Sequence, residues 1–230
     1  MFNYFGSKYT LAKTYQPPKH DVIVEPFAGS AQYAMYWMIE RSDITCVLYD
    51  TDPRVLASWT RILEATPEEI VAWSMKLGDP VVDYIDLANY GGGNKIANAR
   101  IVKKFNTSKY RWARTRAATD GRVTIIEGDY TEAPDIEATW FIDPPYQHQG
   151  HNYEVGSDGI NYRDLAAWCQ TRKGQTIVCE ASPGDWLPFT PHRTHSGLRG
   201  EQNTELVWYS HPEPTLFEID AANLTELTTP

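Results

Sequence analysis

The residues with the clearest chemical potential form one run, Trp140 to Tyr146, in which an apolar stretch leads into Asp143, two prolines and a tyrosine. The run predicts a buried strand that ends at this tetrapeptide, and open α/β sheets bind ligands at the carboxyl ends of their strands. Proline has a fixed φ and no N–H, so carbonyls there are held rigidly and are free to accept hydrogen bonds. Asp143 adds a second acceptor, and Tyr146 adds a face on which a planar ring stacks for about 1–3 kcal/mol. Two acceptors beside a flat face suit an exocyclic amino group.

A second candidate site lies near the N-terminus, where a strand, a small-residue turn and a helix are predicted in succession. Residues 22–24 (Val-Ile-Val) are β-branched, residues 25–31 (Glu-Pro-Phe-Ala-Gly-Ser-Ala) form the turn, and apolar residues continue with helical spacing to Ile39. This is the order of a nucleotide-binding unit, in which small residues let the backbone approach a ligand. The turn holds one glycine, Gly29, rather than three spaced ones, and this weakens a dinucleotide interpretation.

Asp50 ends the next predicted strand, residues 45–49, and lies 21 residues after Gly29. An acid at about this distance from the glycine turn is placed to accept hydrogen bonds from ribose hydroxyls. The alternative is that Asp50 caps the following helix. Asp52-Pro53, however, supplies an N-cap and a first-turn proline for a helix over 53–64, which leaves Asp50 available for a ribose.

The tetrapeptide Asp143-Pro144-Pro145-Tyr146 resembles the Asp-Pro-Pro-Tyr motif of Dam-like (D12 class) DNA adenine-N6 methyltransferases. Residues 25–30 resemble the S-adenosylmethionine loop of the same family, and Gly6-Ser7-Lys8 resembles its Gly-x-Lys segment. The resemblance implies that the cation of Lys8 faces the carboxylate at the methionine end of the cofactor. With Asp50, these elements occur in the order and approximate spacing of the family, over about residues 2–65 and 122–209.

The resemblance also implies which residues form the site. Asp129 follows a predicted strand and is placed to bond the adenine amino group of the cofactor, with Tyr130 beside the ring; a turn-forming Gly-Asp is the alternative. The catalytic residues would be Asp143, Pro144, Pro145 and Tyr146. The residues expected to bind S-adenosylmethionine are Tyr4, Gly6, Lys8, Glu25, Phe27, Ala28, Gly29, Ser30, Asp50, Asp129 and Tyr130.

Residues 94–122 concentrate positive charge in an acidic chain. Nine basic residues and one acid give this window a charge of +8, whereas the whole chain carries −9 and the remainder therefore −17. Phe105, Tyr110 and Trp112 are interleaved with the basic residues and would stack or wedge at base steps. A solvated pair of amphipathic helices is the alternative, but so many like charges favour an anionic partner. The expected DNA contacts are Lys95, Arg100, Lys103, Lys104, Lys109, Arg111, Arg114 and Arg116.

Seven strand-like runs are present, and the last two, residues 192–198 and 204–209, predict a terminal hairpin. The expected fold class is α/β, and the resemblance implies a Rossmann-like, seven-stranded methyltransferase sheet whose last strand is antiparallel. The catalytic domain would comprise residues 1–78 and 121–211, with a small, basic, helical insertion for target recognition at 79–120 and an acidic tail at 212–230.

Two further segments carry expectations of their own. Residues 66–69 (Thr-Pro-Glu-Glu) are strong helix-start signals and predict a helix that runs to about Leu77. Residues 147–161 form a polar, aperiodic stretch directly after the candidate catalytic strand. A loop of this length in this place is expected to act as a mobile lid over the site.

The expected function is that of a DNA adenine-N6 methyltransferase. One adenine flips out of duplex DNA and stacks on Tyr146, and its amino group bonds to Asp143 and to the carbonyl of Pro144. Orientation and charge stabilisation carry the catalysis, and neither a covalent intermediate nor a metal is required. Three alternatives remain: a cytosine-N4 methyltransferase, which more often carries Ser in place of Asp143, an RNA adenine methyltransferase, and a catalytically idle DNA-binding protein.

Bulk properties agree with an enzyme of one large domain. The chain has 230 residues, 42% of them hydrophobic, with no apolar run of membrane-spanning length and no signal peptide, so a cytoplasmic location is expected. Cys46, Cys169 and Cys179 lie in apolar runs and are expected to be reduced core thiols. His148 and His151 lie in a polar loop and are expected to be solvated rather than metal ligands.

Overall fold

The computed structural model describes residues 8, 10–74, 99–148, 159–196 and 202–211, and these form an α/β fold around one seven-stranded sheet. The strand order is β3-β2-β1-β4-β5-β7-β6. Strands β3, β2, β1, β4 and β5 are parallel, and β7 runs antiparallel to both of its neighbours, β5 and β6. The strands are β1 Val22–Glu25, β2 Thr45–Asp50, β3 Val123–Glu127, β4 Ala138–Ile142, β5 Gly174–Ala181, β6 Thr190–Ser196 and β7 Gln202–Tyr209. The predicted fold class, including the antiparallel last strand, is confirmed.

The helices begin where the sequence provides caps. Asp52 caps α2 and accepts a hydrogen bond from Arg54 N, and Thr66 and Glu69 form a capping box on α3. The prediction that the helix starting near Pro67 continues to about Leu77 is wrong. Helix α3 ends at Ala72, because Trp73 leaves the helical conformation and its ring packs against Trp112. The helical segments are η1 Ala12–Thr14, α1 Gln32–Glu40, α2 Pro53–Leu63, α3 Pro67–Ala72, α5 Ala99–Ala118, η2 Tyr130–Glu132 and α6 Tyr162–Gln170.

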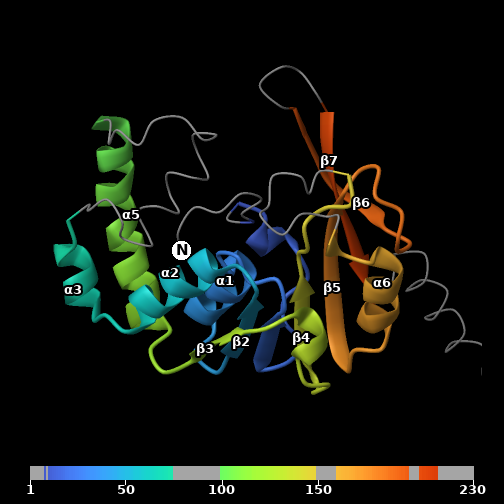
Figure 1. Cartoon of the computed structure of the whole chain (residues 1–230), viewed down its shortest axis with the longest axis horizontal. Helices are drawn as coiled ribbons and strands as arrows, with labels where there is room; N and C mark the ends of the chain where they lie inside the picture. The colour runs from blue at the N-terminus through green and yellow to red at the C-terminus, as the bar shows by residue number, and fades with distance from the viewer. Residues whose placement is uncertain (1–7, 9, 75–98, 149–158, 197–201, 212–230) are drawn as a thin grey trace, which may run out of the picture.

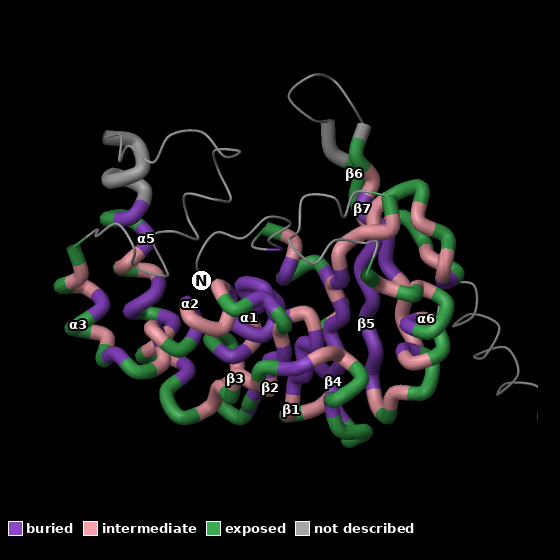
Figure 2. The backbone as a smooth tube through the Cα atoms, in the orientation of Figure 1, coloured by how far each residue is buried: buried purple, intermediate pink, exposed green. Residues whose placement is uncertain are grey.

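Two apolar layers cover the faces of the sheet, and alternate strand residues point into each. On one face Ile23, Leu48, Phe141 and Ile177 pack with helices α1, α2 and α5, while on the other the neighbouring strand residues pack with α6. Figure 1 shows α3 and α5 at one end of the molecule and the β6 and β7 hairpin toward the other. Strands β4 and β5 are buried along most of their length (Figure 2), as expected for central parallel strands.

Helix α5 contributes to the main core. Phe105 and Trp112 are fully buried in the cluster that contains α1 and α2 residues, whereas Tyr110 is 60% exposed. The expectation that all three aromatics stack at base steps is therefore wrong for Phe105 and Trp112, because an amphipathic helix turns these positions toward the protein. The division into catalytic domain, insertion and tail stays a prediction, since residues 79–98 and 212–230 lie outside the described ranges.

Three cysteines, Cys46, Cys169 and Cys179, are free and buried, as predicted. Within the described ranges, no helix combines the length and apolar character that crossing a membrane requires. The segment expected to be a lid lies mostly outside these ranges, since residues 149–158 are among those left undescribed.

Candidate active site

Strand β4 delivers Asp143 to the carboxyl edge of the sheet. All five residues of the strand are buried, and the Asp143 side chain that follows them keeps 22% of its surface exposed. Its position is central, because β4 lies between β1 and β5 in the sheet. A buried, mostly apolar strand that leads into a partly exposed carboxylate is the arrangement that the sequence predicts.

The two prolines present their carbonyls differently. The Pro145 carbonyl accepts a hydrogen bond of 2.5 Å from the Tyr162 hydroxyl of α6, which fixes the turn against that helix. No donor in the described parts of the chain bonds the carbonyl of Pro144. Since proline lacks an N–H and its φ is fixed, this carbonyl is held rigidly beside Asp143. The two acceptors expected from the sequence, the Asp143 carboxylate and the Pro144 carbonyl, therefore follow each other in the chain; Pro144 is buried, and contact of its carbonyl with a ligand stays a prediction.

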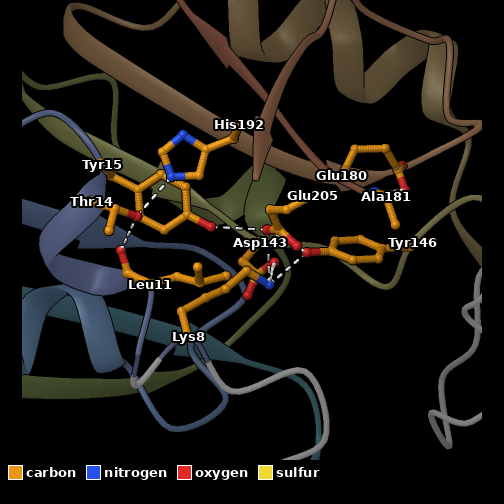
Figure 3. A network of polar contacts seen from close by, with 10 residues as sticks. All are labelled: Lys8, Leu11, Thr14, Tyr15, Asp143, Tyr146, Glu180, Ala181, His192 and Glu205. Atoms are coloured by element: carbon orange, nitrogen blue, oxygen red, sulfur yellow. Dashed lines mark hydrogen bonds and ion pairs between the residues drawn. The ribbon is translucent and has the colours of Figure 1, made fainter. Parts of the chain in front are cut away.

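Lys8 lies inside this site. Its Nζ donates to Asp143 Oδ1 at 2.8 Å and to the Tyr146 hydroxyl at 2.5 Å, and only 6% of the side chain is exposed (Figure 3). The family resemblance implies that Lys8 faces the methionine end of a cofactor, and the structure pairs its cation with the candidate catalytic carboxylate. The role of Lys8 toward a cofactor stays a prediction, while its contacts with Asp143 and Tyr146 are established.

Glu205 completes the cluster and was not among the predicted site residues. Its Oε1 accepts hydrogen bonds of 2.9 Å from the hydroxyls of Tyr146 and Tyr15, and lies 3.4 Å from Lys8 Nζ. The reversed direction of β7 explains its place, because Glu205 is paired with Ala181 at the carboxyl end of β5. An acid in a strand of the terminal hairpin, followed by Leu206 and Val207, was the available sequence signal.

The cluster of Lys8, Asp143 and Glu205 combines one cation with two carboxylates. The nearby carboxylates of Asp143 and Glu205 outweigh burial and hold the pKa of Lys8 above its ordinary value. Burial, with a further contribution from Glu205, raises the pKa of Asp143, although Lys8 opposes this change. Lys8 thus stays protonated, and the three side chains carry a net charge of −1 when both acids are ionised.

A second buried acid, Glu180, fixes the chain that follows the tetrapeptide. Its Oε2 accepts from Gln147 N at 3.2 Å and from Trp186 Nε1 at 2.6 Å, and its Oε1 accepts from Ala181 N at 2.9 Å. Burial raises the pKa of Glu180, and these donors oppose that change. Through these hydrogen bonds, Glu180 holds the loop after Tyr146 against the end of β5.

The predicted cofactor loop lies at the carboxyl edge of β1, next to β4. Gly29 and Ala31 both adopt a φ of +45°, in the left-handed region, as the chain turns into α1. Asp50 fixes this turn, because its Oδ2 accepts from Gly29 N at 2.8 Å and its Oδ1 accepts from Asp52 N at 2.8 Å. Burial raises the pKa of Asp50 to about 6. Each oxygen of Asp50 retains a lone pair, so the same side chain is able to hold the loop and to accept from a hydroxyl.

Glu25, at the end of β1, is only 2% exposed and fixes the predicted cofactor loop to the start of α1. Its Oε1 accepts from Ala34 N at 2.7 Å, in the first turn of α1. Burial raises the pKa of Glu25 to about 8, and the hydrogen bond from Ala34 opposes this change. Ser30 and Ala28 are likewise buried. Direct cofactor contact by these three residues stays a prediction.

Two aromatic rings flank the loop. Phe27 and Tyr130 are stacked with ring centroids 5.5 Å apart and an interplanar angle of 26°, and both side chains are partly exposed. Asp129 caps η2, accepting from Thr131 N at 2.9 Å, so the turn-forming alternative holds for one of its oxygens. Asp129 and Tyr130 remain predicted neighbours of the cofactor adenine. Tyr4 and Gly6 lie outside the described ranges.

The basic residues of α5 divide into two groups. Lys109 donates to the Trp73 carbonyl at 3.1 Å, and Arg116 donates to the Leu63 carbonyl at 3.2 Å and pairs with Asp120, so both help to hold the helix in place. Arg114 is exposed and Arg111 is half-buried. The predicted DNA contacts that the structure does not describe are Lys95 and the side chains of Arg100, Lys103 and Lys104.

Comparisons with known proteins give only structural similarity at low sequence identity. No family model matches the chain, and no curated protein matches its sequence. Similar solved structures include the rRNA methyltransferase AviRa from Streptomyces viridochromogenes, with 13% identity, coverage of 84% of this chain and 79% of that one, and a TM-score of 0.43. The antibiotic-resistance methyltransferase Kmr has 9% identity, coverage of 89% and 94%, and a TM-score of 0.39. A SAM-dependent methyltransferase from Neisseria gonorrhoeae has 12% identity, coverage of 89% and 66%, and a TM-score of 0.35.

Proposed function

We propose that this chain transfers a methyl group from S-adenosylmethionine to the N6 amino group of adenine in duplex DNA. One observation supports the proposal most strongly: a partly exposed carboxylate, Asp143, precedes Pro144, whose carbonyl has no donor among the described residues, at the carboxyl end of a central parallel strand. An exocyclic amino group has two N–H donors, and these two acceptors match them. Tyr146, in the same turn, offers the ring on which the base would stack.

The residues at the ends of β1 and β2 fit S-adenosylmethionine. Gly29 and Ala31 turn the backbone sharply, Asp50 retains capacity for ribose hydroxyls, and the stacked pair of Phe27 and Tyr130 offers partly exposed rings that an adenine would contact. When bound, the cofactor supplies an electrophilic methyl group on a sulfonium. The adjacency of β1 and β4 in the sheet brings this loop and Asp143 to the same edge.

The protein's part in the reaction is positioning and charge stabilisation. Asp143 and the Pro144 carbonyl would each accept one N–H of the amino group, which turns the nitrogen lone pair toward the incoming methyl group. As the nitrogen–carbon bond forms and the methyl–sulfur bond breaks, the nitrogen would become positively charged and the Asp143 carboxylate would stabilise that charge; the methylated amino group would then lose one proton to solvent. Asp143 must be ionised for this role, so activity should fall as the pH drops through its raised pKa.

Duplex DNA is proposed as the substrate on the strength of α5. Arg114 and Tyr110 are exposed on this helix and provide a cation for phosphate and a ring for stacking. The target adenine would have to leave the duplex, at a cost of a few kcal/mol, because the candidate acceptors lie at the edge of a sheet inside the protein. Binding along α5 would offset that cost.

Transfer of labelled methyl from S-adenosylmethionine tests the proposal, with unmethylated duplex DNA, single-stranded DNA and RNA as parallel substrates. Nucleoside analysis of the products should show N6-methyladenine, with duplex DNA preferred. N4-methylcytosine, or label confined to RNA, would replace the proposed substrate with one of the alternatives. No transfer to any of the three by a folded protein that binds the cofactor would contradict the proposal and favour a DNA-binding role without catalysis.

A further inference from the structure

The ion pair between Lys8 and Asp143 raises a problem for the proposed reaction. The pair is close, at 2.8 Å, and the Lys8 side chain is 6% exposed while that of Asp143 is 22% exposed. A cation in contact with Asp143 cancels most of the charge that a developing positive nitrogen would meet. Without another acid, the site would be close to neutral when the amino nitrogen becomes positively charged, and this is when a negative charge stabilises the reacting group most.

Glu205 is the acid that restores this charge. Its carboxylate is 8% exposed and lies 3.4 Å from Lys8 Nζ. Glu205 also accepts from the Tyr146 hydroxyl at 2.9 Å, so it holds both Lys8, which donates to Asp143, and the tyrosine to which Lys8 also donates (Figure 3). Tyr15, which donates to the same oxygen, holds the carboxylate in place.

We propose that Glu205 is a positioning residue for methyl transfer, which anchors Lys8 and Tyr146 and gives the cluster around Asp143 a net negative charge. This inference rests on the proposed function. Glu205 acts through its neighbours and does not touch the amino group. Its contribution is to let Asp143 keep a cationic partner and still stabilise the charge that forms on the amino nitrogen.

The charge environment of Asp143 determines what a substitution at Glu205 should do. Glu205 raises the pKa of Asp143, and Lys8 lowers it. Neutralising Glu205 should therefore lower the pH at which Asp143 takes up its proton. The titratable and charged groups that face this cluster are Lys8, Tyr15, Glu25, Tyr146, Cys179, Glu180, His192 and Glu205.

Two substitutions separate charge from position. Glu205→Gln removes the charge and keeps the size, so kcat should fall by roughly 100-fold, with the acid limb of its pH profile moved to lower pH and the KM values little changed. Glu205→Asp keeps the charge and shortens the reach to Tyr146, so kcat should fall by about 10-fold while the acid limb stays in place. Wild-type kcat in both folded variants would overturn the proposal.

A substrate-free measurement distinguishes this proposal from the proposed function. The protonation of Asp143 can be followed by NMR of protein labelled with ¹³C-carboxyl aspartate, with the signal assigned by its loss in Asp143→Asn. The titration should move to lower pH in Glu205→Gln and remain unchanged in Asp135→Asn, a control whose acid pairs with Lys173 before the start of β5. An unmoved Asp143 titration in Glu205→Gln would refute the role of Glu205, whatever the substrate. A moved titration without N6-methyladenine from the wild-type protein would refute only the proposed function.

The folding of each variant is checked first by near-UV circular dichroism and thermal unfolding. If Glu205→Gln does not fold, Glu205→Asp still decides the positional part, because an unchanged kcat in that variant would mean that the contacts with Lys8 and Tyr146 are dispensable. A fall in kcat that matches a fall in the folded fraction, with no change beyond it, would likewise count against the proposal.

Discussion

Two clusters of acids and cations lie at opposite edges of the same sheet. Asp143, with Lys8 and Glu205, follows β4 at the carboxyl edge, whereas Asp135 precedes β4 and pairs with Lys173 at 3.1 Å. The Lys8 side chain is 6% exposed and that of Lys173 is 64% exposed. Burial raises the pKa of Asp143, while the hydrogen bond from Lys173 lowers the pKa of Asp135. Similar side chains therefore differ in the strength of their electrostatic interactions, because water screens one cluster and is largely excluded from the other.

The difference shows where charge is available for chemistry. Arg172 and Lys173 outnumber Asp135 in the exposed cluster, so its charge is positive and solvent screens it. The buried cluster carries the opposite sign and keeps its field, because little water reaches it. A site that stabilises a developing cation belongs at the buried edge, and the following predictions test this contrast.

Removing Asp143 should have the largest effect. Asp143→Ala takes away one acceptor for the amino group and the charge beside it, so methyl transfer should fall by at least about 1000-fold, as when a preorganised polar group is removed from an active site. Cofactor affinity, measured by calorimetry, should stay near wild type because Gly29 and Asp50 are untouched. The matched variant Asp135→Asn should keep full turnover. Turnover of Asp143→Ala within 10-fold of wild type would contradict the account.

Removing the lysine should lower the stability of the protein more in the buried cluster than in the exposed one. Lys8→Met leaves Asp143 and Glu205 buried without their shared partner, so the free energy of unfolding should fall by about 3–5 kcal/mol. Lys173→Met breaks an exposed pair and should cost no more than about 1 kcal/mol. Urea unfolding followed by tryptophan fluorescence measures both changes. Equal costs would mean that burial does not distinguish the clusters.

The pH dependence of stability should have opposite signs at the two edges. Glu25 has an ordinary pKa of 4.5 when unfolded and about 8 when folded, so the folded protein binds this proton more tightly and its contribution to stability is lost as the pH rises between these values. Asp135 has a lowered pKa, so its contribution is instead lost as the pH falls. Thermal unfolding across this range should show a weaker decline with rising pH in Glu25→Gln. An unchanged decline would contradict the burial argument for Glu25.

The smallest predicted effect concerns the basic helix. Arg114 is exposed, so Arg114→Ala should reduce the slope of log K for DNA against log salt by about 0.9. Arg116 already bonds to the Leu63 carbonyl and pairs with Asp120, so Arg116→Ala should leave that slope unchanged and lower stability instead. Fluorescence anisotropy over a salt series measures the slope. The reverse result would place Arg116, rather than Arg114, on the DNA.

The parts of the fold that follow from local pattern could be predicted. The strand positions, the caps of α2 and the placement of Asp143 after a buried strand all depend on neighbouring residues, and the sequence indicated them. The contact between Lys8 and Asp143 joins positions 135 residues apart, and it depends on how the N-terminal segment crosses the sheet. Glu205 reaches the site only because β7 is antiparallel and its register pairs Glu205 with Ala181.

Helix α5 shows the same limit of local pattern. The density of basic residues predicted a nucleic-acid surface, but charge counts do not reveal which side chains turn inward. Lys109 donates to the carbonyl of Trp73, which follows α3, and Arg116 donates to the carbonyl of Leu63 in α2. The side chains of Phe105 and Trp112 pack in the core. To distinguish these inward-facing residues from exposed Arg114, both the helical periodicity of α5 and the position of the neighbouring helices must be known.

The most direct test of the central claim is genomic. The wild-type chain and Asp143→Ala are each expressed in cells whose DNA lacks N6-methyladenine, and the genomic DNA is analysed by nucleoside mass spectrometry and modification-sensitive sequencing. The account predicts N6-methyladenine at a defined sequence in cells with the wild-type chain and none with Asp143→Ala, although both proteins are folded. N6-methyladenine at equal levels in both, or its absence from both, would contradict the claim that the Asp143 site methylates adenine in DNA.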